Sequence, residues 1–157
     1  MILDERNEFA DAVSVAAVAS TALIGDVMDL GTSGVNMVDQ MYLVIQTDTE
    51  IITGGSAGTI QFALVSDSLA TLGAGVVADC TTHLASAVLV TDDAAANSPQ
   101  LNAGEYIYVG ALPRGVYERY LGVLCTIVTT TVTAGKINAF LTVNPPAWKA
   151  FDAPFHL

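Results

Sequence analysis

Basic residues are scarce in this sequence. Of 157 residues only five are Lys or Arg, against 16 Asp or Glu, and the formal net charge is −11. Proteins that bind nucleic acids use Lys and Arg to neutralise phosphates, and anionic membrane surfaces attract basic segments. The charge excludes a basic patch of useful size, so we expect neither a nucleic-acid partner nor a membrane partner.

Cysteine and histidine are scarce as well, with two of each. Cys80 and Cys125 form no CxxC motif and no cluster with histidine, so we expect no structural zinc. Both cysteines lie in apolar, strand-like segments, which favours buried thiols, and a disulfide between them stays open. The sequence therefore predicts no metal and no cofactor.

Long apolar runs are missing too. The run from Ala12 to Ile24 is too short to cross a bilayer, and Ser14, Ser20 and Thr21 interrupt it. The first 13 residues are acidic where a signal peptide has a basic and then an apolar region. We therefore expect a protein that is not exported.

Charged residues make up only 13% of the chain, while hydrophobic residues make up 52%. A folded domain of this composition has too few charged side chains to cover its surface in the usual way. Part of that surface is therefore expected to lie against another chain, as in an oligomer or a docked subunit.

Apolar and polar residues alternate with a period of two over much of the chain, which is typical of β-strands. The strand candidates are residues 41–49, 59–67, 84–91, 105–112, 120–128 and 137–143. The Gly-rich GGSAG at 54–58 follows the first candidate and precedes the second, so these pieces are expected to form one long hairpin. Six or more strands without interleaved helices predict a two-sheet antiparallel sandwich in a single domain over residues 1–143.

Other segments are less clear. Val13–Val18 fits a helix or a strand, and residues 67–75 are compatible with one helical turn. Asp26 and Asp29 are read as turn residues. The segment 144–157 has three of the five prolines and the only Trp, and its aromatic side chains are costly to expose. It is expected either to fold back on its own sandwich or to act as an arm inserted into a neighbouring subunit.

Motifs for catalysis are absent. His83 would have to serve any Ser-His-Asp triad, because His156 lies next to the last residue, and no GxSxG turn accompanies it. No dinucleotide-binding or phosphate-binding glycine motif is present, and the aspartates do not match a calcium loop. We therefore predict no catalytic residues, and a small hydrolase built around His83 remains only a competing hypothesis.

The segment LPRGVYERYLGV, residues 112–123, holds two of the five basic residues. Pro113 and Gly115 predict a tight turn with Arg114 exposed at its tip. One interpretation is a solvated turn in which Arg114 pairs with Glu118. The other is a guanidinium presented to a partner beside Tyr117 and Tyr120, since Arg and Tyr are enriched at interface hot spots.

Several segments together are similar to the jelly-roll capsid cement (decoration) proteins of tailed bacteriophages. They are MILDERNEFADAVSV at the start, DLG at 29–31, MYLVIQTDT, GGSAGTIQFALVSD, LPRGVYERYLGV and TAGKINAFLTV, in order over most of residues 1–143. The resemblance implies a jelly roll with extended N- and C-terminal arms. It also implies a homo-oligomeric, non-enzymatic virion component, made in the bacterial cytoplasm, that binds the outside of the head and clamps major capsid proteins.

On this basis we predict two sets of contact residues. The candidates for contact with the capsid are Ile2, Leu3, Asp4, Phe9, Arg114 and Tyr117. The candidates for contact between subunits, in a dimer or trimer, lie in the C-terminal arm at 144–157 and are Trp148, Phe151 and Phe155. The alternative function is a carbohydrate-binding module or fibre domain, in which Tyr106, Tyr108 and Tyr120 would form an aromatic surface.

Overall fold

The computed structural model describes residues 5–32, 35–36, 40–72, 80–92 and 96–145. In these residues nearly all regular structure is β-strand, with two short 3-10 helices, η1 (Glu5–Asn7) and η2 (Pro99–Leu101). The fold is therefore all-β, as the alternating pattern predicts.

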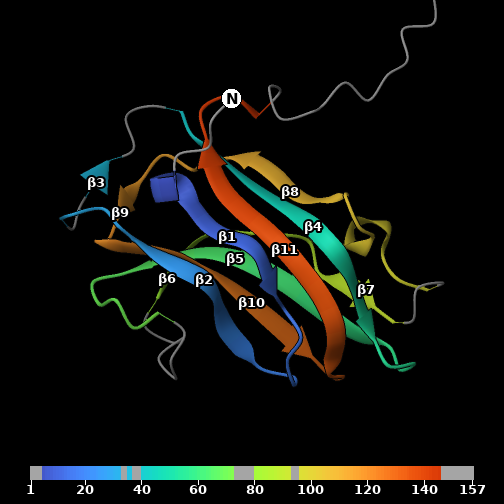
Figure 1. Cartoon of the computed structure of the whole chain (residues 1–157). Helices are drawn as coiled ribbons and strands as arrows, with labels where there is room; N and C mark the ends of the chain where they lie inside the picture. Colours follow the sequence, from blue (N-terminus) through green and yellow to red (C-terminus); the bar gives the residue numbers. More distant parts are fainter. Residues whose placement is uncertain (1–4, 33–34, 37–39, 73–79, 93–95, 146–157) are drawn as a thin grey trace, which may run out of the picture.

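The strands form two main sheets that pack face to face (Figure 1). Sheet A has the order β1 (Glu8–Ser14), β11 (Val132–Thr142), β4 (Tyr42–Thr53) and β8 (Tyr106–Ala111). Sheet B has the order β2 (Thr21–Asp29), β10 (Tyr120–Val128), β5 (Gly58–Asp67) and β6 (Thr81–Ala85), and β7 (Leu89–Thr91) also pairs with β5. A third, small sheet joins β3 (Val35–Asn36) to β9 (Val116–Tyr117).

The connectivity is that of a jelly roll. The chain passes from sheet A to sheet B and back repeatedly, so β1 pairs with β11, and β2 pairs with β10, although each pair is far apart in sequence. Every strand pair is antiparallel. The strand orders β1-β11-β4-β8 and β2-β10-β5-β6 correspond to the two Greek keys of a jelly-roll sandwich. The predicted β-sandwich is therefore confirmed.

The core lies between the two sheets and follows the alternation of the sequence. The inward side chains come from alternate positions of four central strands: Leu43, Ile45, Ile60, Phe62, Leu64, Leu121, Val123, Cys125, Ile127, Ile137, Ala139 and Leu141. Each is at most 4% exposed. Burying branched and aromatic side chains of this size contributes about 1.5–3 kcal/mol apiece. The strand candidate 137–143 ends one residue too late, because Val143 lies beyond the end of β11 and is 66% exposed.

The predicted hairpin around GGSAG is wrong. β4 and β5 are in different sheets, so residues 54–57 make a corner between the layers, not a turn between paired strands. The corner is closed by the Thr53 hydroxyl, which donates to the carbonyl of Ser56 at 2.7 Å, and Gly55 adopts a φ of 91°. A glycine-rich loop between two strands is compatible with a hairpin and with a corner between sheets. The corner forms here because β4 pairs with β11 and β5 pairs with β10, and both partners are far away in the sequence.

The strand β2 was not predicted from the sequence. The end of β1 decides whether the segment Val13–Val18 is a helix or a strand. Val13 belongs to β1, while residues 15–20 form an irregular connection, so the segment from Val13 to Val18 is not a helix. Asp26 lies inside β2 and is not a turn residue. Asp29 does hold a turn, because its Oδ1 accepts the N–H of Gly31 at 2.8 Å. The helical turn expected from residue 67 is not seen in residues 67–72, and 73–75 lie outside the described chain.

Candidate functional site

The turn at Arg114 projects from the end of β8 and is held firmly at its base. We call residues 112–117 the Arg114 turn. Its first residue, Leu112, is buried and donates its N–H to the carbonyl of Met41 at 2.8 Å. The Tyr117 hydroxyl donates to the carbonyl of Pro113 at 2.6 Å, and the backbone of β9 pairs with β3. The turn is therefore closed on itself and joined to the sandwich on two sides.

Tyr117 is the internal support of this turn. Its side chain has no exposed area, and its ring stacks on the His83 ring with centroids 4.0 Å apart. Burial also raises the pKa of the Tyr117 hydroxyl, which therefore stays a protonated hydrogen-bond donor at neutral pH. His83 lies on β6, so the stack links the Arg114 turn to the edge of sheet B.

A polar network extends from His83 into the end of sheet B. The Nε2 atom of His83 lies 2.7 Å from the Oγ of Ser66, and that Oγ accepts the N–H of Glu118 at 3.1 Å. The Glu118 carboxylate in turn accepts the Thr81 hydroxyl at 3.0 Å. These bonds connect β5, β6 and the residue between β9 and β10, and they fix the backbone on which the turn is built.

The two arginines of this segment have different surroundings. Arg119 makes a bidentate ion pair with Asp29, with nitrogen–oxygen distances of 2.9 and 2.8 Å, and its guanidinium lies over the Tyr120 ring. This pair and the Gly31 N–H lower the pKa of Asp29 to about 2. Arg114 is exposed and makes no hydrogen bond or ion pair with any residue that the structure describes. The proposed local pair between Arg114 and Glu118 is not formed.

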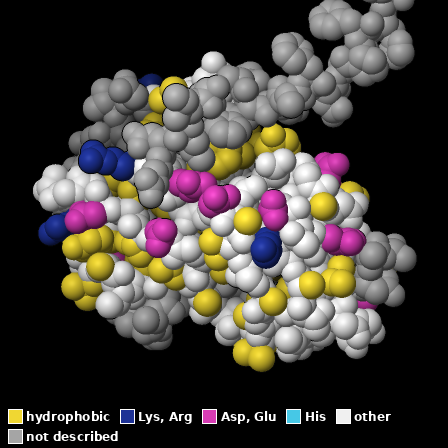
Figure 2. Space-filling model, in the orientation of Figure 1, with side chains coloured by type: hydrophobic (Ala, Val, Ile, Leu, Met, Phe, Trp, Pro, Cys, Tyr) yellow, Lys and Arg dark blue, Asp and Glu magenta, His cyan; other side chains and the backbone are white. Residues whose placement is uncertain are grey.

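The surface around the turn is rich in acidic side chains, so an arginine without a partner among the described residues is unusual there. Figure 2 shows few Lys and Arg side chains on this face, set among more numerous Asp and Glu side chains. A guanidinium presents five donors in a planar fork that matches a carboxylate. The Arg114 turn can therefore bind an acidic group of another molecule without a large rearrangement of its own.

Two of the predicted contact residues are buried, and that part of the prediction is wrong. Phe9 lies on β1 and is 1% exposed, and Tyr117 is 0% exposed, so neither side chain can face a capsid protein. Aromatic residues are common at interfaces, but these two fill the core. Arg114 is exposed as predicted. The other candidates, Ile2, Leu3, Asp4, Trp148, Phe151 and Phe155, lie outside the described residues, as does the predicted C-terminal arm beyond residue 145.

The Ser66–His83 contact was not foreseen from the sequence. Its 2.7 Å spacing resembles the nucleophile and base of a serine hydrolase. However, Ser66 is fully buried and its Oγ already accepts a backbone N–H, so a substrate carbonyl has no access to it here. The contact is best explained as support for the turn. The two residues are 17 positions apart and share no motif, so only the pairing of β5 with β6 brings them together.

The tyrosines of the carbohydrate-binding alternative do not form one surface. Tyr106 and Tyr108 lie on β8 at the edge of sheet A, whereas Tyr120 lies on β10 inside sheet B. Tyr108 packs against the main core, and Tyr120 packs against a second apolar cluster formed by Val65, Leu72 and Leu124. A flat aromatic surface for a sugar ring is therefore not assembled from these three residues.

The described residues hold no group of three or more His, Cys, Asp or Glu side chains that is placed to bind a metal ion. No helix in that part of the chain is long and apolar enough to cross a bilayer. Both cysteines are free thiols, and burial raises the pKa of Cys125 to about 12.

The His83 network predicts a pH dependence of stability. Burial lowers the pKa of His83, and the opposing attraction of the Glu118 carboxylate is weaker. The folded state therefore favours neutral His83, so stability falls as the pH drops through the ordinary histidine pKa of about 6.5. We expect urea unfolding to give a lower free energy about one pH unit below that value than about one unit above it.

The matched variant is His83→Gln, which keeps a polar group near Ser66 but cannot titrate. Its free energy of unfolding should change less than that of the wild type between the same two pH values. Asp29 and Asp67 also have lowered pKa values, but they titrate below about 4 and affect both proteins equally. Equal pH dependence in the two proteins would show that His83 does not titrate on folding.

Comparison with known proteins places the chain in a family. The family model Bbp16 matches residues 9–141, which run from the second residue of β1 to the last residue but one of β11 and include the Arg114 turn. No curated protein matches the sequence. The family match covers most of the chain and all of the main strands of both sheets. The chain therefore belongs to the Bbp16 family.

Proposed function

We propose that this protein is a capsid cement (decoration) protein, which binds the outer surface of a tailed-phage head and stabilises contacts between major capsid proteins. The observation that carries the proposal is the Arg114 turn, a loop held by its own hydrogen bonds. It presents a guanidinium that has no partner among the described residues, in a chain of net charge −11. The jelly-roll connectivity and the sequence resemblance to cement proteins support it.

The role of Arg114 in this proposal is to bind a carboxylate on the capsid. A turn that is already ordered loses little conformational entropy when it docks, so more of the interaction energy appears as affinity. The chain carries a net charge of −11, and like charge disfavours contact between its acidic surface and acidic partners. Arg114 thus sets the orientation of the subunit, and Ile2, Leu3 and Asp4 are proposed as further capsid contacts.

Stabilisation of the shell would follow from mass action. A protein that binds the expanded shell, and not its separated subunits, stabilises the assembled state in proportion to its occupancy. Symmetry repeats the same contact many times, and linked contacts raise the total affinity. Trp148, Phe151 and Phe155 are proposed as contacts between copies of the protein in a dimer or trimer. No catalytic step, metal or cofactor enters this mechanism.

The test is co-sedimentation of the purified protein with empty expanded shells of its cognate major capsid protein. We expect saturable binding at a fixed ratio to the capsid protein, and no binding to unassembled capsid protein. A glycan array with the same preparation tests the carbohydrate-binding alternative. Specific glycan binding without shell binding would replace the proposal with that alternative.

A further inference from the structure

The His83 ring is the joint between the Arg114 turn and the edge of sheet B. It is half-buried, it stacks on the buried Tyr117 ring with centroids 4.0 Å apart, and its Nε2 atom lies 2.7 Å from the Oγ of Ser66. Histidine is the side chain whose ordinary pKa puts a change of charge between about pH 5 and 8. The joint is therefore built on a group that can gain a proton under mild conditions.

The surroundings of Ser66 fix the direction of its hydrogen bond with His83. The Ser66 side chain is fully buried, and its Oγ accepts the N–H of Glu118 at 3.1 Å. Within the described residues the Ser66 hydroxyl has no acceptor other than the Nε2 atom of His83. A buried hydroxyl hydrogen without an acceptor is costly. Ser66 therefore donates to Nε2, and neutral His83 carries its own proton on Nδ1.

A second proton on the ring is incompatible with this arrangement. It would bind to Nε2, so the Ser66 Oγ would face two donors and its own hydrogen would lose its only acceptor. The protonated ring relieves the conflict when it turns Nε2 away from Ser66 and toward water. That movement takes the ring off Tyr117 and opens the bond between Ser66 and the Glu118 N–H to solvent.

The charges near His83 do not reverse this preference. The Glu118 carboxylate attracts a cationic ring, but burial outweighs that attraction and lowers the pKa of His83. Asp67, next to Ser66 on β5, accepts the N–H of the residue two positions ahead, and Arg119 is paired with Asp29. β6 itself has no charged residue, and the Tyr117 hydroxyl on β9 stays neutral.

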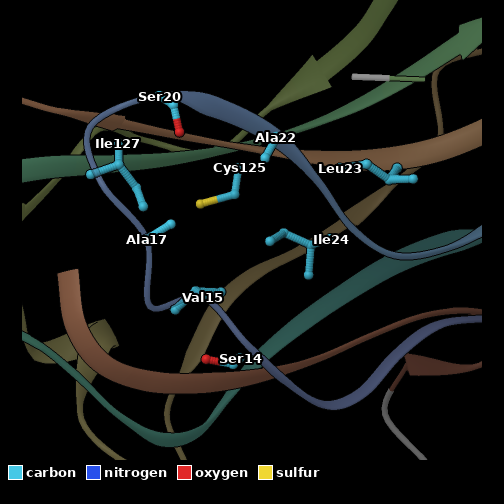
Figure 3. A pocket seen from close by; sticks show the side chains of 9 residues that line it. All are labelled: Ser14, Val15, Ala17, Ser20, Ala22, Leu23, Ile24, Cys125 and Ile127. Carbon is cyan, nitrogen blue, oxygen red and sulfur yellow. The ribbon is translucent and has the colours of Figure 1, made fainter. Parts of the chain in front are cut away.

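The other shifted groups do not titrate in the same range. Figure 3 shows the Cys125 sulfur directed into a small apolar pocket, and none of the lining residues is charged. Burial there raises the pKa of the thiol to about 12, so Cys125 stays neutral. Asp29 and Asp67 have lowered pKa values and stay ionised above about pH 4. His83 is thus the titrating group at the base of the Arg114 turn.

We propose that His83 is a positioning residue that holds the Arg114 turn only as a neutral ring, and that its protonation releases the turn and weakens binding to the shell. Release removes the fixed orientation from which Arg114 docks, so the cost of ordering the turn returns at the moment of binding. The effect on shell binding rests on the proposed function. The release itself does not, because it is a property of the free protein.

The first test is nuclear magnetic resonance of the ¹⁵N-labelled full chain. The nitrogen shifts of His83 identify its tautomer at high pH, which should carry the proton on Nδ1, and a titration gives its pKa in the folded protein. From one pH unit above that pKa to one unit below, the protonated fraction rises from about one in eleven to about ten in eleven. The protection of the Glu118 amide against hydrogen exchange should fall about tenfold relative to that of Val123 in the core.

The matched control is His83→Gln, in which the ratio of Glu118 to Val123 protection should be the same at both pH values. Val123 lies on β10 between two paired strands, so its amide reports global opening. A proton on Nε2 in neutral His83, or Glu118 protection that falls only in step with that of Val123, would overturn the release of the turn.

The second test is co-sedimentation with expanded shells at the same two pH values. Wild-type binding should weaken about tenfold at the lower pH, in proportion to the fraction of molecules that keep the turn closed. Binding of His83→Gln to the same shells should weaken far less, which corrects for titration of the capsid. Equal weakening of the two proteins would overturn the link between His83 and the shell. Absence of shell binding at both pH values would contradict the proposed function, and the exchange result would still decide the release.

Discussion

Replacing Gly25 by alanine is expected to destabilise the fold by about 4 kcal/mol or more, or to prevent folding. Gly25 lies in β2 with a φ of 69°, and its Cα faces the backbone of β1. A Cβ there would lie 1.8 Å from the carbonyl oxygen of Phe9, and a backbone atom cannot move aside as a flexible side chain can. The substitution would force apart the two sheets at the edge where β1 and β2 meet.

The control for this prediction is Gly31→Ala. Gly31 has a similar φ of 82°, but a Cβ at that position would meet nothing within 4 Å. Its cost should be the backbone strain alone, about 1–2 kcal/mol. Urea unfolding of both variants measures the difference. Similar free energies of unfolding for the two would mean that β1 and β2 are not in close contact in the folded protein.

Replacing Arg114 by glutamine is expected to weaken binding to expanded shells by about 30-fold or more. This is the effect of losing a hot-spot contact worth about 2 kcal/mol. The substitution removes the guanidinium but touches no hydrogen bond of the turn, because Tyr117 and Leu112 hold it through the backbone. Binding isotherms by co-sedimentation measure the loss, which should shrink at high salt as the wild-type contact is screened.

The matched control is Gln100→Glu, which changes the net charge by the same amount. Gln100 is exposed on η2, which precedes β8, whereas the Arg114 turn follows it. Only its backbone carbonyl takes part in a hydrogen bond, with the Thr47 hydroxyl at 2.7 Å. Shell binding of Gln100→Glu should therefore equal that of the wild type. If both variants bind equally, Arg114 is not the contact that orients the protein on a shell.

The strands that could be predicted are those whose two faces differ in their exposure to solvent. In β5, for example, one face is core, and Ile60, Phe62 and Leu64 alternate with residues that are only half-buried. β2 was not predicted because Asp26 and Asp29 are residues of a type that is common in turns. Gly25 lets β2 come close to the carbonyl of Phe9 on β1. That contact forms only when the two strands meet in the folded protein, so the sequence around Gly25 does not reveal it.

The candidate site also has one part that the sequence predicts and one part that it does not. The tip of the turn was predictable, because Pro113 and Gly115 act locally on the backbone. The support beneath it was not, because Tyr117, His83 and Ser66 meet only through the pairing of β5 with β6 and the return of the chain at β9. Phe9 lies near the chain end and Tyr117 lies beside Arg114, which made both of them contact candidates. The sequence does not separate an aromatic residue that faces a partner from one that fills the core.

The most direct test of the proposed function is the thermal stability of expanded shells with and without this protein. At a free concentration about 100 times the dissociation constant, binding to the assembled state alone stabilises each site by about 2.7 kcal/mol. We predict that saturating wild-type protein raises the temperature at which the shells dissociate, and that Arg114→Gln at the same concentration raises it far less. Shells that dissociate at the same temperature with and without saturating wild-type protein would contradict a cementing function.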